Sequence, residues 1–387
     1  MSYADIIKKK QKEWKCDSLM NAVFEVQGER IPFSSPLMNW FTYGGVPRNR
    51  IMEIFGDEGS GKSTVCQDIC QNAAKIFDEE YEAKIMELQE KVSDGDKSAS
   101  DELEELQELG PKKVLYIDIE HGFDIGWAKT LGLDLDRIDI MQPPNVFGED
   151  VLQTVRDLVE TGEVGLIVLD SLPALTPKSV LEKKIGERTV AALAGLLNTF
   201  YPLIVPLLTR YNCTLVCVNQ TRDNMDNPWV VKTPGGKATK FYSSLRILMR
   251  KGKPIDFLGN ELPQNTENPA GCIIQATSIK QKTAPNDRKM GTFYLMFQSG
   301  IRPDFDYATL AVKNYGLIKK SIGWYSFVDP ETGEVLADEK GKAIKVNGLG
   351  KVYEFLHNND AYYKKLQDYI TADINGKSGV VDAEESD

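Results

Sequence analysis

Residues 56–63 read Gly56-Asp57-Glu58-Gly59-Ser60-Gly61-Lys62-Ser63, a match to the phosphate-binding pattern G-x-x-x-x-G-K-S/T. An apolar run from Ile51 to Phe55 comes before the motif and a helical pattern follows it, which is the context in which it forms a phosphate site. The glycines let the backbone curl around phosphate oxygens, and the helix N-terminus adds partial positive charge. We therefore expect a nucleoside triphosphate at this loop and at Thr64. Lys62 should reach its β- and γ-phosphates, and Ser63 should ligate Mg²⁺.

Three further apolar runs each end in polar side chains. They are Val114 to Ile119 before Glu120, Leu166 to Leu169 before Asp170, and Thr214 to Val218 before Asn219 and Gln220. Because parallel sheets bind ligands beyond the carboxyl ends of their strands, these side chains are expected to face the phosphate loop. Asp170 is expected to hold Mg²⁺ through water.

Glu120 and Gln220 each have two interpretations. Glu120 is a candidate to orient the water that attacks the γ-phosphate, or it forms a structural ion pair. Gln220 is suited to detect the γ-phosphate without a change of charge, or it caps a loop. The neighbouring His121 is interpreted as a supporting or packing residue.

The alternation of short apolar runs with helical patterns predicts an α/β fold with a largely parallel sheet covered by helices. Later runs follow one another without long helices between them, which predicts added strands with antiparallel pairing. These runs are Leu245 to Met249, Cys272 to Ser278 and Thr292 to Phe297.

The chain is expected to divide around a core at residues 36–305. Residues 1–35 start with an amphipathic pattern that predicts a docking helix and strand, or else a frayed terminus. Residues 79–110 predict an acidic helical hairpin, which is either a solvated spacer or a binding element. Residues 306–372 predict a small α/β domain, and residues 373–387 a disordered acidic tail.

The composition limits the classes of function. With 46 Lys and Arg against 57 Asp and Glu, the net charge is −11, so nucleic-acid binding must be local rather than spread over a basic coat. No run of about 18 apolar residues and no secretory signal is visible, so we expect a cytoplasmic protein without a membrane span. The six scattered cysteines lack the companion ligands of zinc sites and are expected to be reduced thiols.

Taken in order, these sites resemble the RecA family of DNA strand-exchange recombinases. The resemblance covers roughly residues 36–330 and is interrupted by the acidic insertion. The segments that carry it are Ser35 to Phe41, Gly44 to Pro47, Arg50 to Gly56, Ile117 to His121, Asp170 to Lys178, Ile185-Gly186, Asn219 to Arg222, Gly235 to Arg246, Lys280 to Pro285 and Gly323 to Ser326.

The resemblance implies an architecture and an activity. The architecture is a RecA-like ATPase core with a mostly parallel sheet, an N-terminal oligomerisation arm and a small α/β C-terminal domain. The activity is DNA-dependent hydrolysis of ATP with Mg²⁺, in a helical filament on single-stranded DNA that pairs and exchanges strands with homologous duplex DNA in recombination and repair. A mediator or single-strand-binding protein is a further expected partner.

The resemblance also implies roles for single residues. Glu120 would be the catalytic carboxylate, and Gln220 the switch that relays ATP occupancy to a DNA-binding loop. Adenine would be bound at Asp124 and stacked at Trp127. In the filament, the catalytic residues would include Lys280 and Lys282, which reach the ATP of the neighbouring subunit, and Phe241 would pack in the same interface.

Two loops would line the filament axis and bind DNA. The first, at about residues 178–189, carries Lys183, Lys184 and Arg188. The second, at about residues 221–236, carries Arg222, Met225, Trp229 and Lys232. The cations would contact phosphates, and Met225 would act as an apolar wedge between bases.

The chain departs from the family pattern at several positions. Gly195 and Pro202 stand where the family usually has arginines, so phosphate contacts are expected from the first loop instead. The second loop is shorter than the usual bacterial form, and the hairpin at 79–110 is an addition. These features are typical of a divergent relative, such as one encoded by a phage or a plasmid. The alternative functions are a ring-forming helicase with the same core and a regulatory DNA-dependent ATPase.

Overall fold

The computed structural model describes residues 29–144, 146–181, 191–222 and 231–376. Most of the predicted N-terminal arm and most of the predicted tail therefore lie outside the described residues. Lys183, Lys184, Arg188, Met225 and Trp229, all predicted to lie in the DNA-binding loops, also lie outside them.

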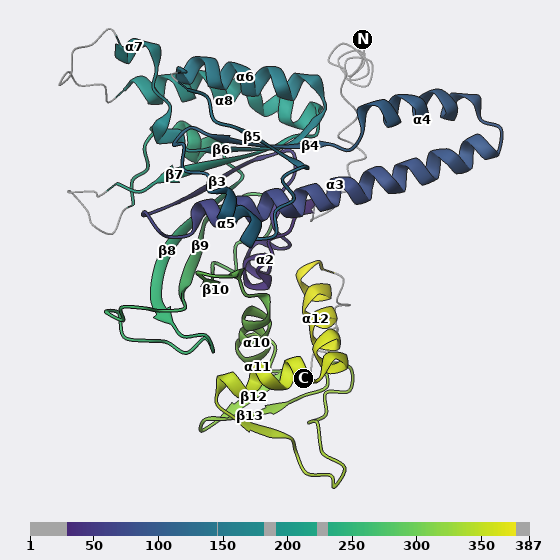
Figure 1. The fold of residues 1–387 in the computed structure, drawn as a ribbon, viewed down its shortest axis with the longest axis vertical. Coiled ribbons are helices and arrows are strands. Elements are labelled where there is room, and N and C mark those ends of the chain that lie inside the picture. The colour runs from purple at the N-terminus through teal and green to yellow at the C-terminus, as the bar shows by residue number, and fades with distance from the viewer. Residues whose placement is uncertain (1–28, 145, 182–190, 223–230, 377–387) are drawn as a thin grey trace, which may run out of the picture.

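Within the described residues, nine strands form one mixed sheet in the order β11-β10-β9-β8-β3-β7-β6-β4-β5 (Figure 1). From β8 to β5 all neighbours are parallel, whereas β9, β10 and β11 are added by antiparallel pairing. The predicted α/β class with a mostly parallel sheet is confirmed. The strands are β3 (Ile51–Gly56), β4 (Lys113–Asp118), β5 (Ile138–Met141), β6 (Val164–Asp170), β7 (Thr214–Gln220), β8 (Leu245–Ile255), β9 (Gly271–Gln281), β10 (Met290–Met296) and β11 (Gly300–Ile301).

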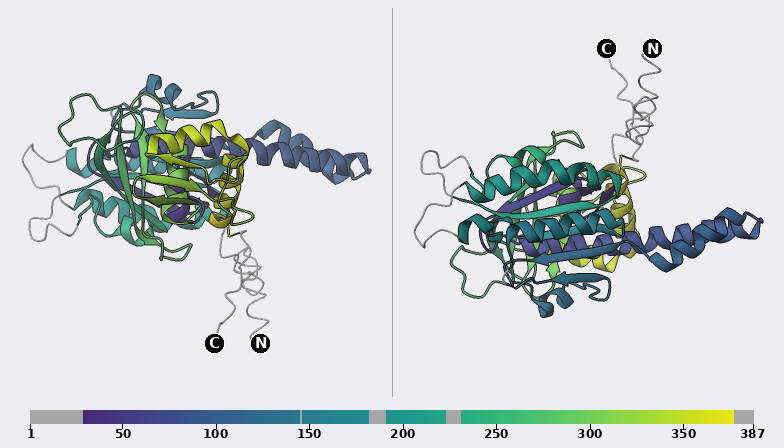
Figure 2. Two further views of the ribbon diagram at one scale, coloured as in Figure 1. Left: turned by 90° about the horizontal axis from the view of Figure 1, so that it is seen from below. Right: turned by 90° about the horizontal axis from the view of Figure 1, so that it is seen from above.

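Helices cover both faces of the parallel part of the sheet (Figures 1 and 2). Successive side chains of a strand point to opposite faces, and β4 illustrates the result. Val114 and Tyr116 join the core beneath α3 (Lys62–Ser93), together with the short α5 (Ile125–Thr130). Leu115 and Ile117 join the core beneath α6 (Gly148–Thr161) and α8 (Ala192–Arg210). Burial on both faces explains why these strands are continuous apolar runs.

The helix that follows the phosphate loop continues beyond the sheet as an arm, which comprises the end of α3 and the whole of α4 (Lys97–Leu109). Both views in Figure 2 show this helix pair projecting from the body. Leu88 and Ala99 are buried between its two helices, and Lys84 reaches Glu102 across them at 3.5 Å. The arm therefore packs mainly on itself, and Met86 is 63% exposed.

The C-terminal part has its own core of aromatic and aliphatic side chains, including Phe305 and Phe327. It attaches to the sheet-bearing part through α2 (Pro36–Thr42): the Ser35 hydroxyl donates to the carboxylate of Asp306, and Leu37 packs in the C-terminal core. Burial raises the pKa of Asp306 well above its usual value. The elements are α10 (Pro303–Lys313), the sheet of β12 (Ile318–Ser321), β13 (Trp324–Phe327) and β14 (Lys345–Asn347), then α11 (Leu349–Asn358) and α12 (Asp360–Ile374).

Short elements complete the described chain. They are β1 (Arg30–Ile31) paired with β2 (Val46–Pro47), a turn of 3₁₀ helix at Leu172–Ala174, α7 (Lys178–Leu181) and α9 (Ala238–Tyr242). The departures Gly195 and Pro202 both lie in α8. Cys66, Cys70, Cys213, Cys217 and Cys272 are buried free thiols, while Cys16 lies outside the described residues.

One helix among the described residues, α8, is long and apolar enough by length and composition to cross a membrane, with a mean hydropathy of 1.6. The core helix of an α/β protein has the same properties, and Leu197, Tyr201 and Ile204 of α8 are buried against the sheet. In total, 28% of the apolar window of α8 is buried, so packing against the sheet accounts for part of its apolar character.

Replacing residues 83–107 with a short Gly-Ser turn is expected to leave the remainder of the chain folded, because α4 packs on α3. The melting temperature should change by less than about 2 °C, which corresponds to ~1 kcal/mol in a chain of this size. Thermal unfolding followed by circular dichroism measures the change. A much larger loss would show that the arm stabilises the sheet-bearing part.

Candidate functional site

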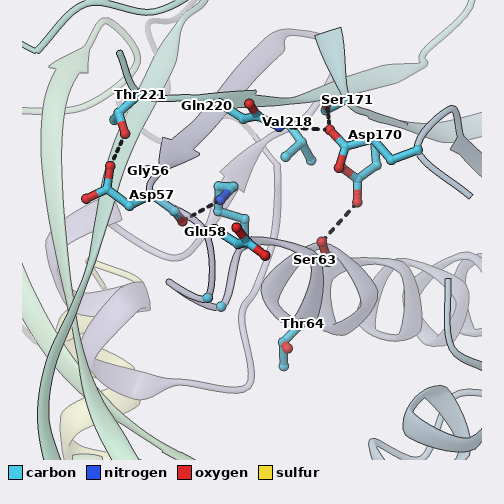
Figure 3. Close-up of a pocket in the computed structure, with 14 residues that line it drawn as sticks. Gly56, Asp57, Glu58, Ser63, Thr64, Asp170, Ser171, Val218, Gln220 and Thr221 are labelled. Carbon is cyan, nitrogen blue, oxygen red and sulfur yellow. Dashed lines mark hydrogen bonds between the residues drawn. The ribbon is translucent and has the colours of Figure 1, made fainter. Parts of the chain in front are cut away.

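A cavity of about 600 Å³ lies at the carboxyl ends of β3, β4, β6 and β7 (Figure 3). It brings together most of the residues predicted for the phosphate site from four separate segments. Its lining consists of Gly56, Asp57, Glu58, Gly59, Gly61, Lys62, Ser63, Thr64, Glu120, Asp170, Ser171, Val218, Gln220 and Thr221.

The glycines of the loop are required by its backbone. A Cβ at Gly56 would lie 2.2 Å from the carbonyl oxygen of Met249, so no larger residue fits. Gly61 has φ of 82°, which places the residue before α3 in the left-handed region. Ser60 is buried and does not line the cavity; its hydroxyl donates to the carbonyl oxygen of Asp57 at 2.8 Å. The loop thus presents its backbone, and the N-terminus of α3, to the cavity.

The ammonium group of Lys62 donates to the carbonyl oxygen of Asp57 at 2.7 Å. Burial lowers the pKa of Lys62, whereas the carboxylates of Asp170 and Glu120 act in the opposite direction. This cation lies in the cavity at the position where the motif predicts contact with phosphate oxygens.

Asp170 ends β6 and points toward the first turn of α3. The Ser63 hydroxyl donates to its Oδ2 at 3.0 Å, and the Tyr116 hydroxyl donates to the same oxygen. Burial raises the pKa of Asp170, and these two hydrogen bonds oppose the shift. A hydroxyl beside a carboxylate is an oxygen-only donor set, which suits Mg²⁺. The described residues contain no cluster of three or more His, Cys, Asp or Glu side chains that would enclose a metal by themselves.

Glu120 follows β4 and is held at the cavity by two donors. The side-chain amide of Gln220 donates to its Oε1 at 3.1 Å, and the Ser171 hydroxyl donates to the same oxygen. The structure therefore brings Glu120 and Gln220 into direct contact, although they are 100 residues apart in sequence. Neither the ion pair considered for Glu120 nor the loop cap considered for Gln220 is formed by these contacts. His121 is exposed beside the site.

Sequence reasoning missed three of the residues that shape this cavity. Ser171 orients Glu120, Tyr116 donates to Asp170, and the hydroxyl of Thr221 donates to the carboxylate of Asp57. Ser171 and Thr221 each follow a predicted strand-end residue directly, so their position next to the site was available from the sequence. The buried hydroxyl in the middle of β4, Tyr116, had no such signal.

The two residues predicted for adenine, Asp124 and Trp127, lie beside the cavity rather than in its lining. Asp124 caps the N-terminus of α5, where its Oδ1 accepts from the backbone of Trp127 at 3.0 Å. The Trp127 indole donates to the hydroxyl of Thr64 at 3.2 Å, which ties α5 to the start of α3.

Lys280, Lys282 and Phe241 form a separate cluster outside the lining of the cavity. Lys280 donates to the backbone carbonyls of Lys240 and Phe241, and Lys282 donates to that of Phe241 at 3.1 Å. Burial, followed by repulsion from Lys282, lowers the pKa of Lys280 to about 8. The Phe241 side chain is 69% exposed. Two cations and an apolar ring thus share one surface.

The described ends of the second predicted loop adjoin the cavity. Arg222 and Lys232 are paired as an antiparallel bridge, in which the Arg222 amide donates to the Lys232 carbonyl at 2.9 Å. Because Arg222 follows Thr221 and Gln220, these cations lie at the base of a segment that starts at the phosphate site.

Comparisons with known proteins agree with the resemblance seen in the sequence. Residues 81–302 match the family described as the RecA N-terminal domain. The protein RecA of Sulfurimonas denitrificans is 30% identical over 308 residues, which are 78% of this chain and 75% of that protein. For the protein RecA of Bacteroides thetaiotaomicron the identity is 32%, with 80% of each chain covered. For that of Thermus aquaticus it is 31%, with 75% and 73% covered.

The substitution Glu120→Gln tests the carboxylate at the cavity. Glutamine keeps an oxygen that accepts from Ser171 but cannot take a proton from water. Hydrolysis of nucleoside triphosphate should fall by roughly 10² to 10⁴, the usual contribution of a general base, while nucleotide affinity is retained. The matched control is Glu163→Gln, an exposed carboxylate that precedes β6 at the opposite end of the sheet. Hydrolysis by Glu120→Gln at the unaltered rate would refute the assigned role.

The substitution Lys62→Ala removes the cation of the cavity. Nucleotide affinity should fall by at least about 10-fold, because a hydrogen bond to a charged group contributes about 1.5 to 3 kcal/mol. Titration with a fluorescent nucleotide measures this loss, and circular dichroism verifies the fold. Unchanged affinity would mean that phosphate is bound elsewhere.

Proposed function

Because the chain belongs to the RecA family of recombinases, DNA-dependent ATPases that act in recombination and repair, we propose that it forms helical filaments on single-stranded DNA and exchanges strands with homologous duplex DNA. One observation carries this proposal. Gln220 contacts Glu120 in the phosphate cavity and is followed directly by Thr221 and Arg222, at the start of the predicted second loop. Gln220, whose side chain contacts Glu120, is thus joined by one peptide bond to the segment that carries the proposed DNA-binding cations.

The residues of the cavity have different roles in ATP hydrolysis. The loop backbone and Lys62 bind and orient the phosphates, which supplies most of the catalysis in phosphoryl transfer. Glu120 orients the attacking water and accepts its proton, with its carboxylate held by Ser171 and Gln220. Gln220 is placed to respond to the γ-phosphate, since its amide both donates and accepts hydrogen bonds.

Ser63 and Asp170 are the residues that would hold Mg²⁺, Ser63 by its hydroxyl and Asp170 through water. The ion would supply neutralisation of phosphate charge. The raised pKa of Asp170 fits this role, because a cation beside the carboxylate offsets the cost of burying its charge.

The adenine base is proposed to bind near α5. The exposed carboxylate of Asp124 can accept from an amino group, and Trp127 offers an aromatic face beside Thr64. The hydrogen bond from the Trp127 indole to Thr64 keeps this ring next to the first turn of α3.

Binding of DNA is proposed at the two loops. Arg222 and Lys232 would contact phosphates from the stems of the second loop, together with Lys183, Lys184 and Arg188, and Met225 would act as an apolar wedge between bases. The last four of these residues lie outside the described residues. Such contacts do not depend on base sequence, because homology is read by pairing between strands. They also reconcile DNA binding with a net charge of −11, since cations at the loops act locally.

Lys280, Lys282 and Phe241 are proposed to face the next protomer. In the described part of the chain neither lysine lines the phosphate cavity of its own protomer, yet the pair offers two cations on one surface. Cations from a neighbour that reach the γ-phosphate would act as arginine fingers do. A head-to-tail contact of this kind does not close on itself, so it generates a filament.

The cellular location of the protein and its loading partners are also proposed. We place the protein in the cytoplasm, where a mediator or single-strand-binding protein would assist its loading on DNA. Closed hexamers with fork unwinding would instead favour the ring helicase, and ATP turnover stimulated by a protein rather than by DNA would favour the regulatory ATPase.

Incubation of the protein with circular single-stranded DNA, homologous linear duplex and ATP should yield joint molecules, and electron microscopy should reveal helical filaments. The pair Lys280→Ala and Lys282→Ala should abolish both products, because the neighbour's ATP loses its cations. Gel electrophoresis of the joint molecules measures the first effect.

The matched control for the lysine pair is Lys253→Ala. This exposed lysine lies near the end of β8 in an ion pair with Glu261 and is not part of the proposed interface. Filaments and joint molecules from the lysine-pair variant at the unaltered level would contradict the proposed interface.

A further inference from the structure

A hydrogen bond connects the phosphate loop directly to the segment after β7. The hydroxyl of Thr221 donates to the carboxylate of Asp57, the second residue of the loop (Figure 3). Both residues line the cavity. Thr221 is therefore held by the phosphate loop itself, independently of the contact between Gln220 and Glu120.

The two stems of the segment 221–236 are also fixed to the core by one buried amide. The Oδ1 atom of Asn219 accepts from the backbone of Gln220 at 2.9 Å, and its Nδ2 atom donates to the carbonyl oxygen of Pro234 at 3.2 Å. The same Nδ2 atom donates to Glu53 at 2.8 Å, and Glu53 is fully buried in an ion pair with Arg246. The core end of both stems is therefore anchored to β3 through Glu53.

Beyond this anchor the stems are joined to each other by the bridge between Arg222 and Lys232. Thr221 lies between the buried anchor at Asn219 and this bridge. A displacement of the Thr221 side chain is thus passed to both stems, since the bridge holds them together.

We propose that the hydrogen bond between Asp57 and Thr221 is a second route by which nucleotide binding is transmitted to the stems of this segment, parallel to Gln220. The inference rests on the proposed function, because it assumes that the stems contribute to DNA binding. Thr221 is accordingly a positioning residue and takes no part in the chemistry.

Electrostatics supply the reason for the coupling. A triphosphate bound at residues 56–64 adds several negative charges next to the carboxylate of Asp57 and attracts Lys62, which donates to the carbonyl oxygen of Asp57. Like charges repel, so the carboxylate shifts away from the phosphates. Because Thr221 is bonded to that carboxylate, its position depends on whether phosphate is bound.

The test measures how strongly nucleotide tightens DNA binding. The dissociation constant for a labelled single-stranded oligonucleotide is determined by fluorescence anisotropy, without nucleotide and with a saturating nonhydrolysable ATP analogue. The ratio is the dissociation constant without nucleotide divided by the dissociation constant with the analogue. In Thr221→Val this ratio should fall by about threefold to tenfold, the scale of one partly exposed hydrogen bond. In Thr221→Ser, which keeps the hydroxyl, the ratio should be preserved.

A double-mutant cycle assigns the effect to the contact. Asp57→Ala should lower the ratio, and adding Thr221→Val to it should cause little further loss, since the second change removes a bond already broken. An unchanged ratio in Thr221→Val, or losses that add in the double variant, would overturn the proposal.

Hydrogen exchange of the backbone amides at Val231, Lys232, Thr233, Gly235 and Gly236 provides a readout that does not involve DNA. The nucleotide analogue should alter exchange there in the unsubstituted protein and in Thr221→Ser, but much less in Thr221→Val. If the unsubstituted protein binds no DNA in either state, the proposed function fails, and the exchange experiment alone decides whether the hydrogen bond between Asp57 and Thr221 transmits nucleotide binding. An equal change in exchange in all three proteins would reject this transmission.

Discussion

The register of the parallel strands is the constraint on which the site depends. Gly56 is paired with Gln220, and Asp118 with Asp170, so β3, β7, β6 and β4 end at one edge of the sheet. Carboxyl ends of parallel strands always meet in this way, which brings the phosphate loop, the carboxylates of Asp170 and Glu120 and the amide of Gln220 into one cavity. A slip of one residue in any pair would turn its side chain to the opposite face of the sheet. The buried ion pair of Glu53 and Arg246, between β3 and β8, belongs to the same framework.

Position along the strands made the cavity predictable from the sequence. Glu120, Asp170 and Gln220 each follow an apolar run, and the motif at 56–63 fixes the strand beside which they must lie. The contacts among these residues were not predictable, because they depend on side-chain directions beyond the strand ends. The contact of Gln220 with Glu120 and that of Thr221 with Asp57 are of this kind. Likewise, helical periodicity predicted helices in the acidic insertion, but a pattern within two helices cannot specify that the pair projects from the body.

The acidic residues of the arm and the cations of the candidate site occupy different parts of the molecule. The acidic residues of the arm begin near the middle of α3, whereas the phosphate loop lies at its N-terminus, so about half of a 32-residue helix separates them. Screening in physiological salt acts over about 8 Å, which is far shorter than such a helix. The roles proposed for Lys62, Arg222 and Lys232 in binding phosphate and DNA are therefore compatible with a chain that is acidic as a whole. The arm projects from the body of the molecule.

ATP turnover is proposed to require both DNA and a neighbouring protomer. Gln220 and Thr221 of the cavity lead into the proposed DNA-binding segment, and Lys280 and Lys282 lie outside the lining that the described residues form. The rate of ATP hydrolysis per protomer, measured over a wide range of protein concentration with and without single-stranded DNA, tests this claim most directly. Turnover should be slow in dilute protein and should rise steeply with concentration when DNA is present. A rate per protomer that is independent of both concentration and DNA would contradict it.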